Sequence, residues 1–335
     1  MFRATVLVGV LAGFSIAAFA SDAAAQEQQG RAIYTASEAG AYHSSFCPPI
    51  PVVMGKAGFG GYVCTPSGGT PDNIAKVLAD PRTFGFAQLD VLARWALDNI
   101  EAAKKLVVIR TLACEGLWLV ARSKNMATVT FGQIVGHARR LQFAVADGGS
   151  RASFEFLQKI DPDGLGRART IHILDNATAT IESVASGYAD VGFFVQFVEP
   201  SNRNIKLLHE RRLHAVPVVS HELIAAKAAD IPVYRVQSFN LGEWSSITGS
   251  GQQTTTCTPA VIITGAPESI VDPRDAIDQR ALLSSIKAAP DSAFLPHDGR
   301  LARMVSSSRS VPSAALKEML AAYHVAKKRA EAAAP

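Results

Sequence analysis

Two glycine-rich loops carry the side chains of this sequence that are best suited to hold a small ligand. Residues 67–70 read Ser-Gly-Gly-Thr, and residues 147–153 read Asp-Gly-Gly-Ser-Arg-Ala-Ser. Each loop follows a run of strand-like composition and precedes a run with helical spacing. The first N–H groups of a helix lack backbone partners and carry a partial positive charge, and glycine lets a ligand approach them. The two loops are therefore candidate anion sites, although glycine and serine also precede helices simply to turn and cap the chain.

Polar side chains in both loops would add hydrogen bonds to such an anion. Ser67 and Thr70 offer hydroxyls in the first loop, and Ser150 and Ser153 offer them in the second. Arg151 could make a charge-assisted contact to a carboxylate, or it could point into solvent. We interpret Thr70 and Ser150 as the N-caps of the helices that follow, because hydroxyl side chains are preferred at that position.

The elements that must position these loops alternate between strands and helices. We expect strands at residues 32–35, 61–65, 82–88, 106–111, 116–121, 141–146, 170–174, 190–195 and 254–264. We expect helices at residues 71–78, 89–103, 151–159, 178–186, 272–289 and 312–331. This alternation predicts an α/β fold with parallel sheets and helices on both faces. Ligands of such sheets bind beyond the carboxyl ends of the strands, where both loops would lie.

The two halves of the chain have a similar order of expected elements. Each half contains a strand, a glycine-serine loop, a helix and then a second strand that starts with Gly-Phe. These second strands read Gly-Phe-Ala-Gln at 85–88 and Gly-Phe-Phe-Val-Gln at 192–196, so both end in glutamine. A chain of 335 residues is large for a single core. We therefore expect two similar α/β lobes.

The first 25 residues have the layout of a secretory signal peptide. Arg3 precedes an uncharged apolar run at 4–20, and small-x-small cleavage patterns occur at 18–20 and 23–25. We expect cleavage after residue 25 in preference to residue 20, with a membrane anchor as the alternative. No later stretch is long and apolar enough to span a bilayer, so we expect a periplasmic chain that does not cross the membrane.

Composition and motifs argue against several classes of function. The net charge is only +4, the basic residues are dispersed, and aromatic residues do not interleave with basic clusters, so nucleic-acid binding has little support. The sequence lacks the Gly-x-Ser-x-Gly, His-Glu-x-x-His and P-loop motifs. Neither a Cys-x-x-Cys pair nor histidines at zinc spacing occur. We therefore expect no catalytic residues, no metal and no cofactor.

Four cysteines, at positions 47, 64, 114 and 257, remain in a chain that we expect to be exported. An even number in an exported protein indicates disulfides, and four cysteines allow three pairings. Buried free thiols are the alternative.

The order of several stretches resembles the TAXI family of solute-binding proteins, the periplasmic receptors of one class of tripartite (TRAP) transporters. The stretches are 39–43 (AGAYH), 65–93 (the first glycine loop, its helix and the strand that ends in glutamine), 117–124 (LWLVARSK), 143–157 (FAVADGGSRASFEFL), 185–195 (ASGYADVGFFV) and 257–264 (CTPAVIIT). The resemblance extends from about residue 30 to residue 330. The first turn, at 37–46, is less rich in glycine than the family pattern, and the cysteines are not a general family feature.

The resemblance implies a type II periplasmic-binding-protein fold. Two α/β lobes would be joined by a hinge of two crossing strands, with a ligand cleft between them. The first lobe would hold residues 30–115 and 258–335, and the second would hold 116–257. On that layout Cys114 and Cys257 both fall at the crossings and would form one disulfide, while Cys47 and Cys64 would form another within the first lobe.

The resemblance also implies a function. The protein would capture a small organic anion, either an amino acid such as glutamate or a dicarboxylate, and deliver it to TRAP-type membrane subunits. We expect ligand contacts from Tyr42, Ser67, Gly69, Thr70, Gln88, Ser150, Arg151, Phe193 and Gln196. The alternatives are a receptor of the same fold that serves an ABC importer or a sensor kinase, an exported α/β enzyme, and a redox or scaffold protein that uses the cysteines.

Overall fold

The computed structural model describes residues 31–38, 40–122, 130–197, 202–228, 231–240, 252–296, 299–307, 309–310 and 313–333. The predicted signal peptide lies outside these residues. Within them, none of the helices combines the length and the apolar character that a membrane span requires.

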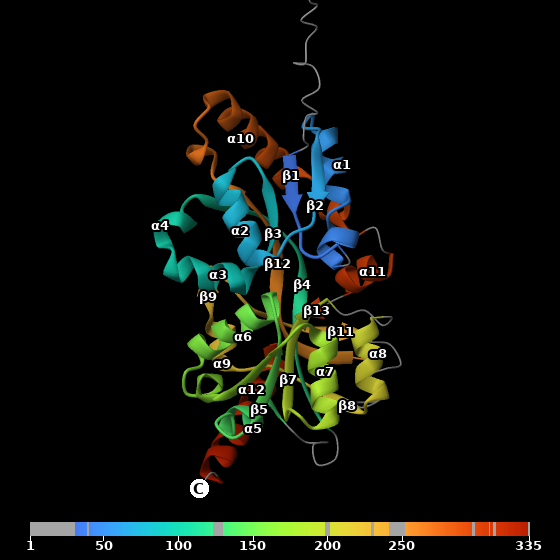
Figure 1. The fold of residues 1–335 in the computed structure, drawn as a ribbon, viewed down its shortest axis with the longest axis vertical. Coiled ribbons are helices and arrows are strands. Elements are labelled where there is room, and N and C mark those ends of the chain that lie inside the picture. The colour runs from blue at the N-terminus through green and yellow to red at the C-terminus, as the bar shows by residue number, and fades with distance from the viewer. Residues whose placement is uncertain are drawn as a thin grey trace, which may run out of the picture.

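Two lobes follow one another along the long axis of the molecule, and two long strands run through both (Figure 1). The first lobe holds β1 (Arg31–Tyr34), β2 (Tyr62–Thr65), β3 (Phe84–Gln88), a helical turn at Tyr42–Phe46, α1 (Pro49–Lys56), α2 (Thr70–Ala79), α3 (Leu89–Asp98), α4 (Ile100–Ala103), α10 (Pro273–Ala288) and α11 (Gly299–Ser307). The second lobe holds β5 (Gln142–Ala146), β6 (Thr170–Leu174), β7 (Val191–Gln196), β8 (Leu213–Val216), β11 (Arg235–Asn240), α5 (Phe131–Gly136), α6 (Gly149–Ile160), α7 (Ala177–Ser186), α8 (Arg203–Glu210), α9 (His221–Ala225) and α12 (Ser313–Ala332). The shared strands are β4 (Leu106–Arg122) and β12 (Gln252–Gly265).

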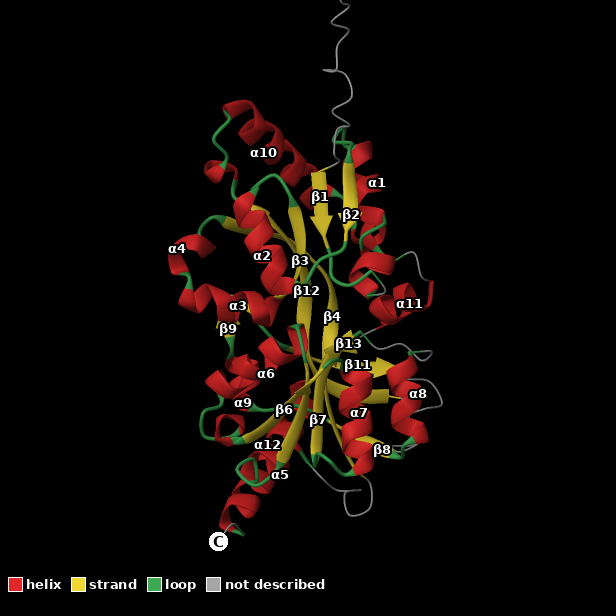
Figure 2. Ribbon diagram, viewed as in Figure 1, coloured by secondary structure: helices red, strands yellow, loops and turns green. Residues whose placement is uncertain are grey.

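The strand order is the same in both lobes. In the first lobe parallel strands run in the order β2-β1-β3, and β12 pairs antiparallel with β3. In the second lobe parallel strands run in the order β6-β5-β7, and β4 pairs antiparallel with β7. Helices cover both faces of each half of the sheet (Figure 2). This repeated topology, with two strands shared between lobes, is the type II fold that we expected.

Each lobe buries apolar side chains on both faces of its half of the sheet, as parallel sheets require. Phe84, Phe86 and Ile262 are fully buried in the first lobe. Phe143 and Trp118 are fully buried, or nearly so, on opposite faces in the second. Each lobe therefore has buried clusters of its own, which explains why the lobes can form similar units although one chain enters both.

β4 is one continuous strand, which corrects the prediction of two strands at 106–111 and 116–121. The intervening residues 113–115 pair with β12, where Cys114 lies opposite Pro259 and Glu115 lies opposite Thr258, and the register shifts at residue 112. The polar residue and the cysteine there interrupted the apolar pattern, but the neighbouring strand supplies the hydrogen bonds that hold the chain extended. The crossing between the lobes therefore lies inside the β-sheet.

The structure contains both disulfides that the family layout implied. Cys114 and Cys257 join β4 to β12 at the crossing, with Cα atoms 5.5 Å apart. Cys47 and Cys64 join the chain after the first helical turn to β2, with Cα atoms 6.0 Å apart. The hinge strands are thus covalently linked to each other.

The C-terminal helix lies on the second lobe, which corrects the assignment of all of 258–335 to the first. α12 packs along α5 at the far end of the second lobe (Figure 1). A Cβ atom on Gly132 would lie 2.3 Å from the carbonyl oxygen of Tyr323, and one on Gly136 would lie 2.6 Å from the Cβ of Ala330. Two glycines on one face of α5 let the helices approach closely. Sequence position alone could not show which lobe this amphipathic helix would cover.

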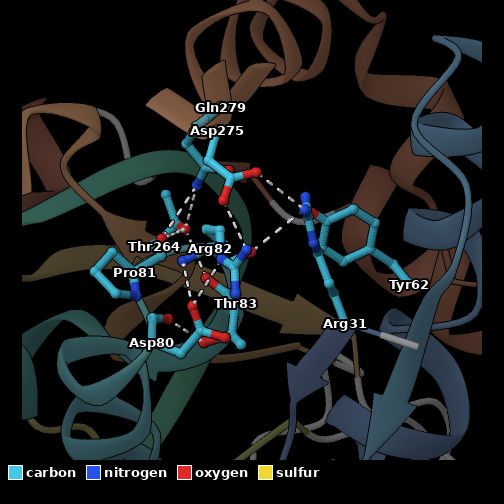
Figure 3. Close-up of polar contacts among 9 residues, drawn as sticks. All are labelled: Arg31, Tyr62, Asp80, Pro81, Arg82, Thr83, Thr264, Asp275 and Gln279. Carbon is cyan, nitrogen blue, oxygen red and sulfur yellow. Dashed lines mark hydrogen bonds and ion pairs between the residues drawn. The ribbon is translucent and has the colours of Figure 1, made fainter. Parts of the chain in front are cut away.

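A polar cluster fastens α10 to the strands of the first lobe (Figure 3). Arg82 donates to Asp275 at 2.7 Å, and Arg31 lies 3.5 Å from the same carboxylate. Gln279, which is buried, donates to the hydroxyl of Thr264 at 2.8 Å. The partly exposed ion pairs contribute little free energy on their own, whereas the buried hydrogen bond satisfies two groups that water cannot reach. This cluster positions α10 and takes no part in the cavity described next.

Candidate functional site

One cavity lies where the two lobes meet, beyond the carboxyl ends of β3 and β7. Its volume is about 420 Å³, which suits a small organic molecule. Most of its polar lining comes from six side chains, those of Tyr42, Thr70, Gln88, Glu115, Ser150 and Gln196. Both lobes and the hinge strand β4 therefore contribute to it.

Two helices begin at this cavity, one from each lobe. Their N-caps are Gly69, with φ of 89°, and Gly148, with φ of 74°. Side chains with a Cβ rarely adopt such backbone angles, so glycine is required at both positions. This corrects the interpretation of Thr70 and Ser150 as N-caps, since each lies inside the first turn. The free N–H groups and positive ends of α2 and α6 make the cavity attractive to an anion.

The hydroxyls of Thr70 and Ser150 tie each helix start to the end of the neighbouring strand. Thr70 Oγ1 accepts the N–H of Gln88 at 3.0 Å, and Ser150 Oγ accepts the N–H of Val195 at 2.9 Å. The two bonds occupy equivalent places in the two lobes, because β3 and β7 are equivalent strands. Each hydroxyl still has its own proton for a second hydrogen bond.

Gln88 reaches from the first lobe to the second. Its Oε1 atom lies only 2.0 Å from the position that a Cβ on Gly149 would occupy. Gln88 is 5% exposed, so its amide lies buried against the start of α6. A side chain at position 149 would therefore displace the flexible amide end of Gln88.

Among the described lining residues, Glu115 is the only one with a carboxyl group. It accepts a hydrogen bond from the hydroxyl of Tyr42, and the side chain of Gln88 also bonds to it. Burial, together with the negative charge of the nearby Asp90, raises the pKa of Glu115 to about 8, although the two hydrogen bonds act against this rise. The group is therefore largely protonated at neutral pH when the cavity holds no cation.

Asp90 is a second buried carboxyl, behind the cavity at the start of α3. Its Oδ2 accepts from the hydroxyl of Tyr234 at 3.1 Å, and its Oδ1 accepts the N–H of Val91 at 2.8 Å. Burial raises its pKa, and these hydrogen bonds oppose the rise. Asp90 thus adds negative potential near Glu115 without lining the cavity itself.

Aromatic rings close one side of the cavity. Phe197, just beyond β7, packs against Phe46 with ring centroids 4.6 Å apart and meets the edge of Tyr42 at 5.9 Å. Gln196 is held by the amide of Asn204, which donates to its Oε1 at 2.8 Å. An aromatic ring from the second lobe therefore packs against the first lobe on this side of the cavity.

Six of the nine predicted contact residues line the cavity: Tyr42, Gly69, Thr70, Gln88, Ser150 and Gln196. Their contact with a ligand stays a prediction.

The other three lie outside the lining. Ser67 Oγ accepts the N–H of Gly69 at 3.3 Å within its own loop. Arg151 is half exposed and lies 2.9 Å from Glu155 on the same helix. Phe193 is fully buried in the hydrophobic core of the second lobe, with its ring 5.2 Å from that of Phe154. These positions follow from the direction of each side chain, which the order of residues in a loop does not define.

Sequence reasoning missed eleven of the seventeen lining residues, and four of those eleven are Glu115, Gly149, Phe197 and Asn202. Glu115 had a detectable signal, because it is a lone acidic residue inside an apolar strand pattern at the expected lobe boundary. Phe197 directly follows a predicted strand end and could have been included with Gln196. The other two gain their place only from contacts across the lobes or within loops.

The described lining contains no lysine, arginine or histidine. Across the described residues, no group of three or more His, Cys, Asp and Glu side chains could hold a metal ion. Positive potential therefore comes from the two helix starts, and negative potential comes from Glu115 with Asp90 behind it.

Comparison with known proteins identified similar solved structures only. No protein-family model matches the chain, and no curated protein matches its sequence. Among the solved structures, a TctC solute binding protein from Polaromonas is 13% identical over 90% of this chain and 97% of its own, with a TM-score of 0.45. MatC from Rhodopseudomonas palustris with bound malate is 13% identical over 89% and 99%, with a TM-score of 0.43. The amino acid ABC transporter substrate-binding protein AbpA from Streptococcus pneumoniae, bound to L-arginine, is 11% identical over 87% and 96%, with a TM-score of 0.41.

These similarities are weak in both sequence and superposition. The assignment to the type II fold rests on the repeated strand order and the two shared strands. Membership of the TAXI family stays a prediction.

Proposed function

We propose that this protein is a periplasmic receptor that captures a small organic anion between its two lobes. The observation that carries the proposal is that two helix starts, one from each lobe, open into a single cavity of about 420 Å³. A ligand carboxylate there would accept N–H groups from both lobes at once. Binding would favour the closed arrangement, since only that arrangement presents both helix starts to one ligand.

The ligand class proposed is an amino acid such as glutamate, or a dicarboxylate. Thr70 and Ser150 would donate to the carboxylate, while Gln88 and Gln196 would bond a second polar group. The cavity offers fixed hydrogen-bond donors, and its described lining has no histidine, lysine or cysteine, which supports capture without chemical change. The two disulfides support an oxidising compartment such as the periplasm.

We propose TRAP-type membrane subunits as the partner that receives the ligand. This part rests on the ordered resemblance to the TAXI receptors. Reconstitution of the protein with the membrane subunits encoded beside its gene would test it, and uptake that depends on both components would support it. Uptake with an ABC importer instead would replace this partner.

Native mass spectrometry of the protein as purified tests the receptor proposal first. It would be followed by unfolding, refolding and a thermal-shift panel of the common amino acids, their desamino carboxylates and dicarboxylates. A compound that raises the unfolding midpoint and is recovered unchanged supports the proposal. Recovery of a chemically altered compound would indicate an enzyme, and no stabilisation by any member would contradict an anion receptor of this class.

A further inference from the structure

Glu115 occupies a special place in the cavity. It lies on β4 where this strand crosses from one lobe to the other, beside the disulfide between Cys114 and Cys257. Its side chain lines the cavity yet is only 6% exposed. A carboxyl group buried at this depth loses most of its hydration and needs compensation from its neighbours.

The neighbours do not provide a positive charge. Tyr42 on the helical turn, Gln88 on β3 and Asp90 on α3 face it, and Thr258 lies opposite on β12. On β7, the nearest residue in the sheet is Gln196, which pairs with Gly116, the residue after Glu115. Every one of these groups is neutral or acidic, and no described lysine, arginine or histidine lines the cavity or acts on the Glu115 carboxyl. A buried carboxylate beside a second buried carboxyl is strongly disfavoured without a cation.

Where α2 and α6 begin, the cavity instead favours negative charge. Their unpaired N–H groups and the hydroxyls of Thr70 and Ser150 favour a negative group. The same cavity thus offers hydrogen-bond donors for an anion at the helix starts. It also offers the Glu115 carboxyl, which could accept from a cation and has no cationic partner in the protein. A zwitterion satisfies both, whereas a dicarboxylate would place further negative charge near Glu115.

We propose that Glu115 accepts the ammonium group of an amino-acid ligand whose carboxylate is held by the starts of α2 and α6. The inference rests on the proposed receptor function and narrows its ligand class from organic anions to amino acids. Glu115 is then the residue that rejects dicarboxylates and desamino acids. Tyr42 and Gln88 hold its carboxyl group in place through their hydrogen bonds.

Binding of an amino acid is linked to a proton. Burial and Asp90 raise the pKa of Glu115 to about 8, so the empty site holds a proton that the ammonium group must displace. Affinity for an amino acid therefore increases as the pH rises from 6 to 8, by up to about tenfold for each pH unit. A dicarboxylate would bind best when Glu115 is protonated, so its affinity would change in the opposite direction.

Matched probes test this inference by isothermal titration calorimetry at pH 6, 7 and 8. L-glutamate and glutarate share the same carbon chain and differ only by the amino group, and L-leucine and 4-methylpentanoate form a second pair. Further pairs come from any amino acid that the thermal-shift panel identifies. Each pair is titrated into the wild type, Glu115→Gln and the control Glu101→Gln, whose carboxylate is 83% exposed on α4.

We expect an amino acid to bind the wild type at least about tenfold more tightly than its desamino partner, with affinity that increases with pH. Glu115→Gln should lose about 10- to 100-fold for the amino acid, lose the pH dependence and bind the desamino partner as well as before or better. Glu101→Gln should match the wild type. Unchanged binding of a tight carboxylate shows that Glu115→Gln has folded.

Three results would separate the possible failures. Equal affinity for both members of every pair, or unchanged amino-acid affinity in Glu115→Gln, overturns the inference while the receptor function stands. Preference for a dicarboxylate that weakens as the pH rises overturns it as well. Binding of no amino acid and no carboxylate overturns the proposed function itself.

Discussion

Individual residues at the lobe crossing determine the chemistry of the cavity. Glu115 is buried there beside Tyr42 and Gln88, and its pKa is raised to about 8 mainly by burial. Its ordinary value is 4.5, so between pH 4.5 and 8 the folded chain keeps a proton that the unfolded chain has lost. The empty protein therefore loses stability through this group as the pH rises across that window.

Replacement of Glu115 by Gln should remove this loss. The free energy of unfolding of the ligand-free wild type should fall by up to about 1.4 kcal/mol more per pH unit between pH 5 and 8 than that of Glu115→Gln. The variant should be the more stable protein at pH 8, because no buried charge forms. Urea denaturation at pH 5, 6.5 and 8 measures the difference. Glu101→Gln serves as the control, and parallel pH profiles for Glu115→Gln and wild type would contradict the prediction.

A side chain at position 149 should displace the amide of Gln88, which occupies the space. In Gly149→Ala the new Cβ would meet Gln88 Oε1 at 2.0 Å, so the amide must move away from Glu115. We expect a loss of about 1 kcal/mol in stability and at least about tenfold in ligand affinity. A double-mutant cycle with Gln88→Ala provides the control. Equal effects of Gly149→Ala with and without the Gln88 side chain would show that this contact is not the cause.

At the scale of elements, α2 and α6 are equivalent parts of the two lobes. Each begins after a glycine with positive φ, and each is tied to a strand end through a hydroxyl. Asn73 adds a further tie in the first lobe, since its amide donates to the carbonyl oxygens of Thr35 and Phe86 at 2.8 Å. These bonds fix the direction in which the helix starts point, and so they fix where an anion is attracted.

Alanine at the glycine caps should therefore reduce both stability and ligand binding. Gly69→Ala and Gly148→Ala should each cost about 1–3 kcal/mol, because φ values of 89° and 74° disfavour a Cβ. Gly55→Ala is the matched control within α1, where a Cβ meets nothing within 4 Å and should stabilise the helix by up to about 1 kcal/mol. Thermal and urea unfolding measure all three variants. A loss at Gly55 as large as at the caps would refute the conformational explanation.

At the scale of the whole molecule, β4 and β12 connect the lobes and the disulfide between Cys114 and Cys257 links them. The lobes also meet through side chains, as Lys159 on α6 lies 3.4 Å from Asp98 on α3. Phe197 adds an apolar contact by packing on Phe46. Motion between the lobes must therefore occur about a covalently joined pair of strands.

Loss of the hinge disulfide should destabilise the protein more than loss of the first-lobe disulfide. The two bonds close segments with sequence separations of 143 and 17 residues. Chain entropy predicts costs of about 5 and 3 kcal/mol respectively. Urea unfolding of Cys114→Ala/Cys257→Ala and Cys47→Ala/Cys64→Ala measures the difference of about 2 kcal/mol. A smaller cost for the hinge pair would mean that the bond strains the folded hinge or that the unfolded chain retains structure.

The sequence by itself determined the local structure of this protein. Strand and helix periodicity and the glycine loops predicted most of the elements, because backbone hydrogen bonds and side-chain periodicity act over a few residues. The similar order of elements in the two halves predicted the two lobes. The disulfide pairing came from the family layout, and it agrees with the structure. Six residues expected to contact a ligand could be placed at the cavity for the same reason: they directly adjoin strand ends and helix starts.

Only the tertiary structure decided how distant residues combine. It placed Glu115 beside Tyr42, set Gln88 against Gly149, packed α12 on the second lobe and directed Phe193 into the core. Each of these contacts joins residues far apart in the chain or depends on side-chain direction, which periodicity does not encode. The polarity of the cavity, and with it the ligand class that we infer, arises from such contacts.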